Sequence, residues 1–199
     1  MNKIIIKIIS CFWILFFSEI NAEENASVAT QLLMEGKRSE AVDLLKILAD
    51  SGDKFAYARL LSIEGDYSKA IKIFKELAGD GNIAALYELH IKYKYGHGTK
   101  ADRPKAARLL RRAAEAGYLP AIRSLGDSMY QKYRETGGSE YELQAFELYS
   151  KASAQLDYEA TENLIHDFFN NPNSSYFSIN KSIKLLKLLH KISPNRKWN

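Results

Sequence analysis

Cysteine is almost absent from this chain of 199 residues, whose one cysteine is Cys11. Cys11 lies in an N-terminal segment that we expect to be removed, so the mature chain would contain none. A protein without cysteine has no disulfides, and its fold must be held by packing alone. The rest of the chain is long enough for one domain with a sizeable core.

A strong excess of one charge is also missing. The 28 Lys and Arg residues against 24 Asp and Glu residues leave a formal net charge of +4. This balance is too mild to indicate a nucleic-acid-binding protein by itself.

The sequence also lacks the common catalytic and metal-binding motifs. It contains no GxSxG elbow, no glycine-rich phosphate loop and no HExxH. None of the four histidines has a second residue at a spacing typical of metal ligands. They are His90, His97, His166 and His190. We therefore expect no metal site, no cofactor and no enzymatic activity.

The first 22 residues differ from all that follows. Lys3 and Lys7 precede an apolar run over residues 8–17, and small and polar residues then lead to Ala22. This order is typical of a secretory signal peptide cleaved after Ala22, which predicts a periplasmic or secreted protein. The alternative is a retained anchor, although the apolar run is short of the roughly 20 residues that span a membrane.

A repeated frame organises the remainder of the chain. Each copy starts at an alanine, reaches a glycine 11 residues later, an alanine 15 residues later and a leucine 19 residues later. The fourth copy departs from the frame because Leu156 stands where the others have glycine. The starting alanines are Ala41, Ala70, Ala106 and Ala145. Such self-similarity predicts a repeat protein, and repeat proteins usually serve as binding surfaces.

Within each copy, apolar residues recur at helical spacing on both sides of the glycine turn. The starting alanines then fall where the two helices of a pair cross, because a one-carbon side chain permits close approach. Residues 82–98 predict one such helix, which ends at Gly96–Gly98, and Asp102 with Pro104 predicts the start of the next. The fold class is therefore all-α, with antiparallel helix pairs stacked into an α-solenoid.

One stretch, residues 79–126, resembles the Sel-one-like repeat family, a relative of the tetratricopeptide repeat. The matching residues are Ala85, Leu89, Tyr93, Gly96, Gly98, Asp102, Lys105, Ala106, Ala113, Ala114, Gly117, Ala121, Leu125 and Gly126. The resemblance extends over roughly residues 26–170, and it implies a right-handed solenoid that works as an adaptor or scaffold. Some secreted members are cysteine-rich and linked to β-lactam binding, and the lack of mature cysteines sets this chain apart from them.

One helical face of the repeats is a candidate groove. At 100° per residue, the positions 2, 6 and 9 residues after the frame's second alanine lie opposite the core stripe. In a stacked solenoid this face lines the concave surface, where tyrosine and arginine would anchor a peptide. The alternative is that its aromatic residues are buried by a curved superhelix. The positions hold Tyr87, Ile91, Lys94, Arg123, Asp127, Tyr130, Glu162, His166 and Phe169.

Two basic segments stand out. The first is a predicted helix with Arg103, Lys105, Arg108, Arg111 and Arg112, which is either a solvated outer face or a contact for an anionic partner. The second is the C-terminal segment, residues 174–199, which contains no acidic residue. It predicts a final helix over Asn180–Lys191, either as a cap for the solenoid or as a docking helix for an anionic surface. Its basic residues are Lys181, Lys184, Lys187, Lys191, Arg196 and Lys197.

The sequence thus predicts a signal peptide over residues 1–22, about four helix pairs over residues 23–173 and a capping helix over residues 174–199. The leading hypothesis is an exported scaffold that binds an unidentified protein or peptide, with no nucleic acid as partner. The alternatives are a cell-envelope enzyme acting on β-lactam or peptidoglycan, and a factor that contacts anionic polymer or lipid.

Overall fold

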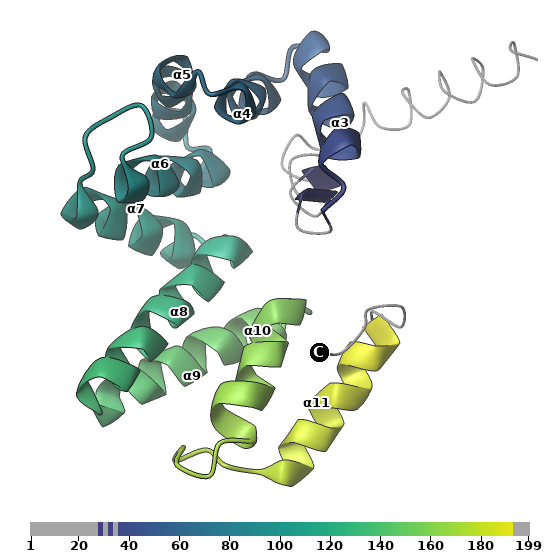
Figure 1. Ribbon diagram of the computed structural model, residues 1–199, viewed down its shortest axis with the longest axis vertical. Coiled ribbons are helices and arrows are strands. Elements are labelled where there is room, and N and C mark those ends of the chain that lie inside the picture. Colours follow the sequence, from purple (N-terminus) through teal and green to yellow (C-terminus); the bar gives the residue numbers. More distant parts are fainter. Residues whose placement is uncertain (1–27, 30–31, 34–35, 193–199) are drawn as a thin grey trace, which may run out of the picture. The chain divides into compact units, whose positions relative to one another are not determined.

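The computed structural model describes residues 28–29, 32–33 and 36–192, and these residues form two compact units that divide after Asp102 (Figure 1). Throughout the described part the secondary structure is helical, without strands. The expected signal peptide, the cleavage after Ala22 and the basic residues Arg196 and Lys197 lie outside the described residues. No helix in the described ranges is long and apolar enough to cross a membrane.

The first unit contains two helix pairs. They are α3 (Arg38–Asp50) with α4 (Lys54–Glu64), and α5 (Tyr67–Gly79) with α6 (Ile83–Tyr95). Each helix packs on the next one in sequence. Phe55 of α4 meets Phe74 of α5 edge to face, with ring centroids 5.5 Å apart, and this contact joins the two pairs.

The second unit contains the remaining pairs and the final helix. They are α7 (Arg103–Glu115) with α8 (Leu119–Thr136), and α9 (Ser139–Ser153) with α10 (Tyr158–Asn163), which continues as the π-helix η1 (Leu164–Phe169). Helices α8 and α9 lie side by side (Figure 1). The last helix, α11 (Ile179–Ile192), packs on η1 and begins one residue before the predicted start.

The frame alanines are buried, as their spacing predicts. Ala41, Ala70 and Ala145 are 0% exposed and Ala106 is 2% exposed. Their counterparts in the second helix of each pair are equally enclosed: Ala56, Ala85, Ala121 and Ala160. A buried one-carbon side chain permits two helix axes to approach to the short end of the usual range of about 8–10 Å.

Polar caps directly after the turns start several of the second helices. The Asp53 side chain accepts hydrogen bonds from the amides of Phe55 and Ala56, at 2.8 and 3.0 Å. Asn82 and Asp157 cap α6 and α10 in the same way. Each of these caps satisfies amides that have no partner inside the helix.

The loop between α6 and α7 lies tightly against α5. Gly98 has a φ of +70°, and a Cβ atom there would lie 2.5 Å from the Cβ of Tyr67. The family's glycine-x-glycine turn is therefore a packing contact here, since no larger residue fits this close approach.

The turn of the fourth copy has Leu156 where the other copies have a glycine, and it loses the conformational freedom of that glycine. Gly52, Gly81 and Gly117 have φ values of 98°, 92° and 89°, and Leu156 takes the same left-handed conformation at φ 63°. A side chain in this region costs about 1–2 kcal/mol. Leu156 recovers little of this cost by burial, because it is 58% exposed.

Helix α11 is attached through a buried carboxylate. Glu142 of α9, 3% exposed, accepts bonds from the Ser174 hydroxyl, the Ser175 amide and the Ser175 hydroxyl at 2.8, 3.0 and 2.8 Å. Beside it, Tyr176 stacks on Phe146 with centroids 3.8 Å apart. These contacts fix the segment from which α11 starts.

We expect Leu156→Gly to stabilise the protein by about 1 kcal/mol, because glycine removes the left-handed strain and only part of that gain is offset by its extra freedom in the unfolded chain. Urea unfolding of the purified chain measures the change. Gln155→Gly is the matched control, since Gln155 is also exposed and does not have a positive φ. Equal effects of the two substitutions would contradict the strain at Leu156.

We expect Ala106→Leu to destabilise the protein by about 1–3 kcal/mol, because extra methylene groups at a buried helix contact force the helices apart. Ala107→Leu places the same side chain on the exposed side of α7 and serves as the control. Thermal unfolding of both variants should show a lower midpoint for Ala106→Leu alone.

Candidate binding surfaces

The predicted groove residues of the first unit lie on α6. Tyr87 and Ile91 are half-buried, and Lys94 is exposed with its ammonium group 5.0 Å from the centre of the Tyr95 ring. Tyr87 stacks on His90 at 5.8 Å between centroids. This face therefore presents a mixed aromatic, apolar and cationic surface on a single helix.

An ion pair joins the neighbouring helices α4 and α6. Arg59 Nε lies 3.2 Å from Glu88 Oε1, and the two side chains are 12% and 14% exposed. Both residues occupy the third position after the frame's second alanine. The first unit thus uses this position for internal attachment.

Lys92 is a buried cation that the sequence analysis missed. It is 5% exposed, and its ammonium group lies 5.0 Å from the centre of the Tyr67 ring. Burial lowers its pKa from the ordinary lysine value. His97 stacks on the rings of Tyr67 and Tyr95, with ring centroids 4.9 and 5.7 Å apart. An aromatic cluster therefore covers the end of α6.

In the second unit, Arg123 is engaged inside the protein. Its Nη1 atom lies 3.1 Å from Asp157 Oδ2 and 2.9 Å from Glu159 Oε2, and the side chain is 12% exposed. These contacts attach α8 to α10. Arg123 therefore contributes little exposed surface to the predicted groove, and its replacement would loosen the unit.

Asp127 gathers donors from two other helices. The Tyr149 hydroxyl of α9 donates to Asp127 Oδ1 at 2.7 Å, and Asn163 Nδ2 donates to the same oxygen at 3.3 Å. Burial, followed by the bond to the Asp127 carboxylate, raises the pKa of Tyr149 far above its usual range. Asp127 itself is exposed, so this cluster of hydrogen bonds lies at the surface of the unit.

Tyr130, His166 and Asp167 lie close together on α8 and η1. Burial and the Asp167 carboxylate, which accepts from the Tyr130 hydroxyl, raise the pKa of Tyr130. His166 Nδ1 lies 2.8 Å from Asp167 Oδ1, with the imidazole 86% exposed. The half-buried Tyr130 ring also packs on Phe168 at 5.5 Å between centroids.

Phe169 does not join this surface, because the helix changes its winding. Residues 164–169 are a π-helix, in which the amide of Asn170 donates to the carbonyl of Ile165, five residues earlier. The 100° per residue used to place Phe169 holds only in an α-helix. Phe169 is consequently turned into the core at 5% exposure.

The second unit therefore presents what we call the acidic face, defined by Asp127, Tyr130, Glu159, His166 and Asp167. Its three carboxylates outnumber the two nearby cations, which are Arg123, paired with Glu159, and Arg134, close to Tyr130. The repeating offsets predict Asp127, Tyr130 and His166, whereas Glu159 and Asp167 lie outside these offsets. Aromatic surface with excess carboxylate suits a partner with cationic side chains.

Most of the basic side chains of helix α7 are exposed to solvent. Arg103, Arg108, Arg111 and Arg112 are exposed on α7, while Lys105 is half-buried. In the part of the chain that the structure describes, no three His, Cys, Asp or Glu side chains are grouped to hold a metal ion.

Two solved structures are similar to this chain. A Sel1 repeat protein from Oxalobacter formigenes matches over 77% of this chain and 64% of its own, with 17% identity and a TM-score of 0.59. A protective antigen of uropathogenic Escherichia coli strains with an SLR fold matches over 76% of this chain and 33% of its own, with 17% identity and a TM-score of 0.53. This chain therefore spans less than two thirds of either protein.

At this level of identity the likeness shows the fold: the chain is an all-α solenoid of the Sel-one-like repeat type. No family model and no curated protein matches the sequence.

We expect the stability of the protein to fall as the pH rises above about 10, because Tyr149 ionises in the unfolded chain but stays protonated in the fold. Tyr149→Phe should make this fall less steep by up to about 1.4 kcal/mol per pH unit. Urea unfolding between about pH 9 and 11 measures the slope.

The control for this measurement is Phe74→Leu, a core substitution that removes no titratable group. It should lower stability by a similar amount at each pH. If Tyr149→Phe behaves in the same way, the hydroxyl of Tyr149 is not the group responsible.

Proposed function

We propose that this chain is an exported scaffold that binds a protein or peptide partner through the acidic face of its second unit, with the α6 face of the first unit as a further contact. The observation that carries the proposal is that Asp167 joins Tyr130 of α8 to the exposed His166, while Asp127 and Asp167 both lie near the Tyr149 hydroxyl. The repeat fold supports it, because helical repeats commonly serve as interaction scaffolds.

The charges on this face favour a partner segment that contains lysine or arginine. Asp127 and Asp167 are held in place by Tyr149, Asn163 and Tyr130, so a cationic side chain would meet oriented carboxylates. Pre-organised acceptors lower the ordering cost of binding, and charge complementarity raises specificity and the association rate. Tyr130 supplies the aromatic area that anchors interfaces.

A cell-envelope enzyme has less support. His166 and Asp167 form a histidine–carboxylate pair, but the imidazole lies open to solvent. A general base needs a nucleophile or a substrate proton within hydrogen-bonding reach, in a site that limits water.

Export with cleavage after Ala22 is also part of the proposal. It is supported by the order of charged, apolar and small residues in residues 1–22.

The test is site-specific photo-crosslinking with envelope extract. A photo-reactive amino acid at His166 or Lys94, both exposed, should capture the same protein. The control positions are Arg108 on α7 and Lys72 on α5, which are also exposed and lie off the proposed faces. Asp167→Asn in the His166-labelled chain should reduce capture several-fold without lowering helicity, because a carboxylate is lost.

Capture of equal strength from Arg108, or capture that Asp167→Asn leaves unchanged, would remove the acidic face as the binding surface. Arg123 is left intact in these chains, because its contacts with Asp157 and Glu159 make its loss a stability change.

A further inference from the structure

Helix α11 has one face that packs on the rest of the second unit. Ser182 and Leu189 are 2% and 0% exposed, and Leu185 is half-buried between them on the same side. This face lies against η1 and α10. Capping of the solenoid by this helix stays a prediction.

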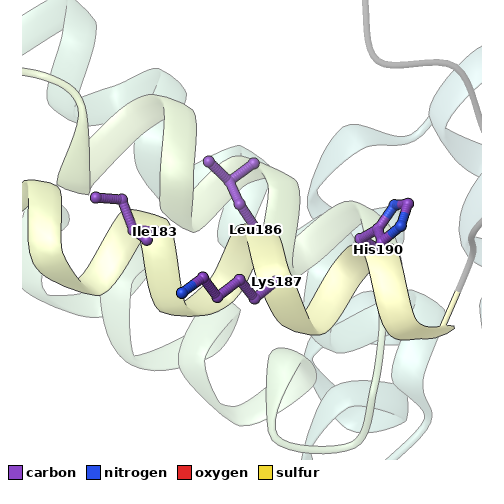
Figure 2. Close-up of a pocket in the computed structure, with 4 residues that line it drawn as sticks. All are labelled: Ile183, Leu186, Lys187 and His190. Carbon is purple, nitrogen blue, oxygen red and sulfur yellow. The ribbon is translucent and has the colours of Figure 1, made fainter.

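A second apolar stripe on α11 faces outward. Ile179, Ile183 and Leu186 are 58%, 45% and 37% exposed. Figure 2 shows Ile183 and Leu186 with Lys187 and His190 along one side of the helix, where they line a shallow hollow of about 440 Å³. A helix that served only as a cap would place polar side chains here, since the outer face of a terminal repeat meets water.

The lysines of α11 lie next to this stripe. At 100° per residue from Ile179, the exposed apolar residues fall within about 40° of one direction, and Lys187 and Lys184 follow at about 80° and 140°. Both lysines are exposed. No acidic residue occurs between Ser174 and Asn199, and the sequence after α11 adds Arg196, Lys197 and Trp198.

We propose that the exposed face of α11 docks on an anionic phospholipid bilayer. An apolar stripe beside a row of lysines suits a helix that lies in the membrane interface, with the stripe in the acyl boundary and the ammonium groups at the headgroups. Each lysine near an anionic surface contributes about 1 kcal/mol. The docking face is opposite in charge to the acidic face and acts independently of it.

The charge pattern argues against the other occupants of this stripe. A second copy of α11 on the same face would bring two lysine rows together without a carboxylate between them. A purely apolar partner segment would leave Lys184 and Lys187 without a role. An anionic bilayer satisfies both, because its acyl boundary accepts the apolar stripe and its headgroups accept the lysines.

The test is sedimentation of the full chain with vesicles of phosphatidylcholine, with or without phosphatidylglycerol. We expect binding only to the anionic vesicles, and weaker binding as salt shortens the screening length below about 10 Å. Lys184→Gln with Lys187→Gln should raise the lipid concentration for half-binding about thirtyfold. Ile183→Ser with Leu186→Ser should raise it at least about tenfold, with circular dichroism as the check on folding.

Arg108→Gln with Arg112→Gln is the matched control. It removes two exposed cations from α7, where no large apolar side chain is exposed. This pair should change half-binding by less than about threefold, because charge without an apolar stripe gives little insertion. The full chain is used throughout, so any contribution of residues 1–27 is common to all variants.

Three results would overturn the proposal: equal sedimentation of the wild type and the lysine variant, an equal loss in the α7 pair, or binding that does not require phosphatidylglycerol. The lysine variant changes only exposed side chains, so its result stands even if the serine variant unfolds.

Discussion

Close contact between the helices at the buried alanines is the constraint on which this structure depends. Ala41, Ala70, Ala106 and Ala145 are buried, and a second buried alanine follows each of them 15 residues later. Because the buried alanines recur at the same offsets, they limit which offsets of each helix can reach the surface, although Arg123 and Phe169 show that tertiary contacts change this locally. The positions available for a binding surface are therefore set by the packing, before any functional residue is chosen.

Most of the fold follows from local rules that the sequence states directly. The helix ending at Gly96 and the buried alanines agree with the structure. Three features do not follow from it. Leu156 adopts the left-handed conformation that glycine adopts at the same turn in the other copies. The π-helix shifts Phe169 into the core. Lys92 is a buried cation, although lysine on a helix usually indicates an exposed position. None of the three is indicated by local propensity.

The candidate surfaces were less predictable than the fold. Helical offsets indicate which side chains share a direction, but not which partners they meet. Arg123 has the correct offset, yet Asp157 and Glu159 from the next pair hold it. Asp167 of the acidic face lies in the π-helix η1. The exposed apolar stripe of α11 can be recognised only once the structure shows that Leu189 is buried on a different side of the helix.

Glu142 has a consequence for how such a chain can change in length. Repeat arrays gain and lose units readily where neighbours meet through interchangeable apolar layers. The join between α9 and α11 is different, because a buried carboxylate there requires the hydroxyl groups of Ser174 and Ser175. A foreign repeat inserted at this join would leave the Glu142 carboxylate without its hydrogen-bond donors. This loss would lower the stability of the fold by about 3–5 kcal/mol. Recombination is thus expected upstream of α9, while residues 139–192 are inherited as one block.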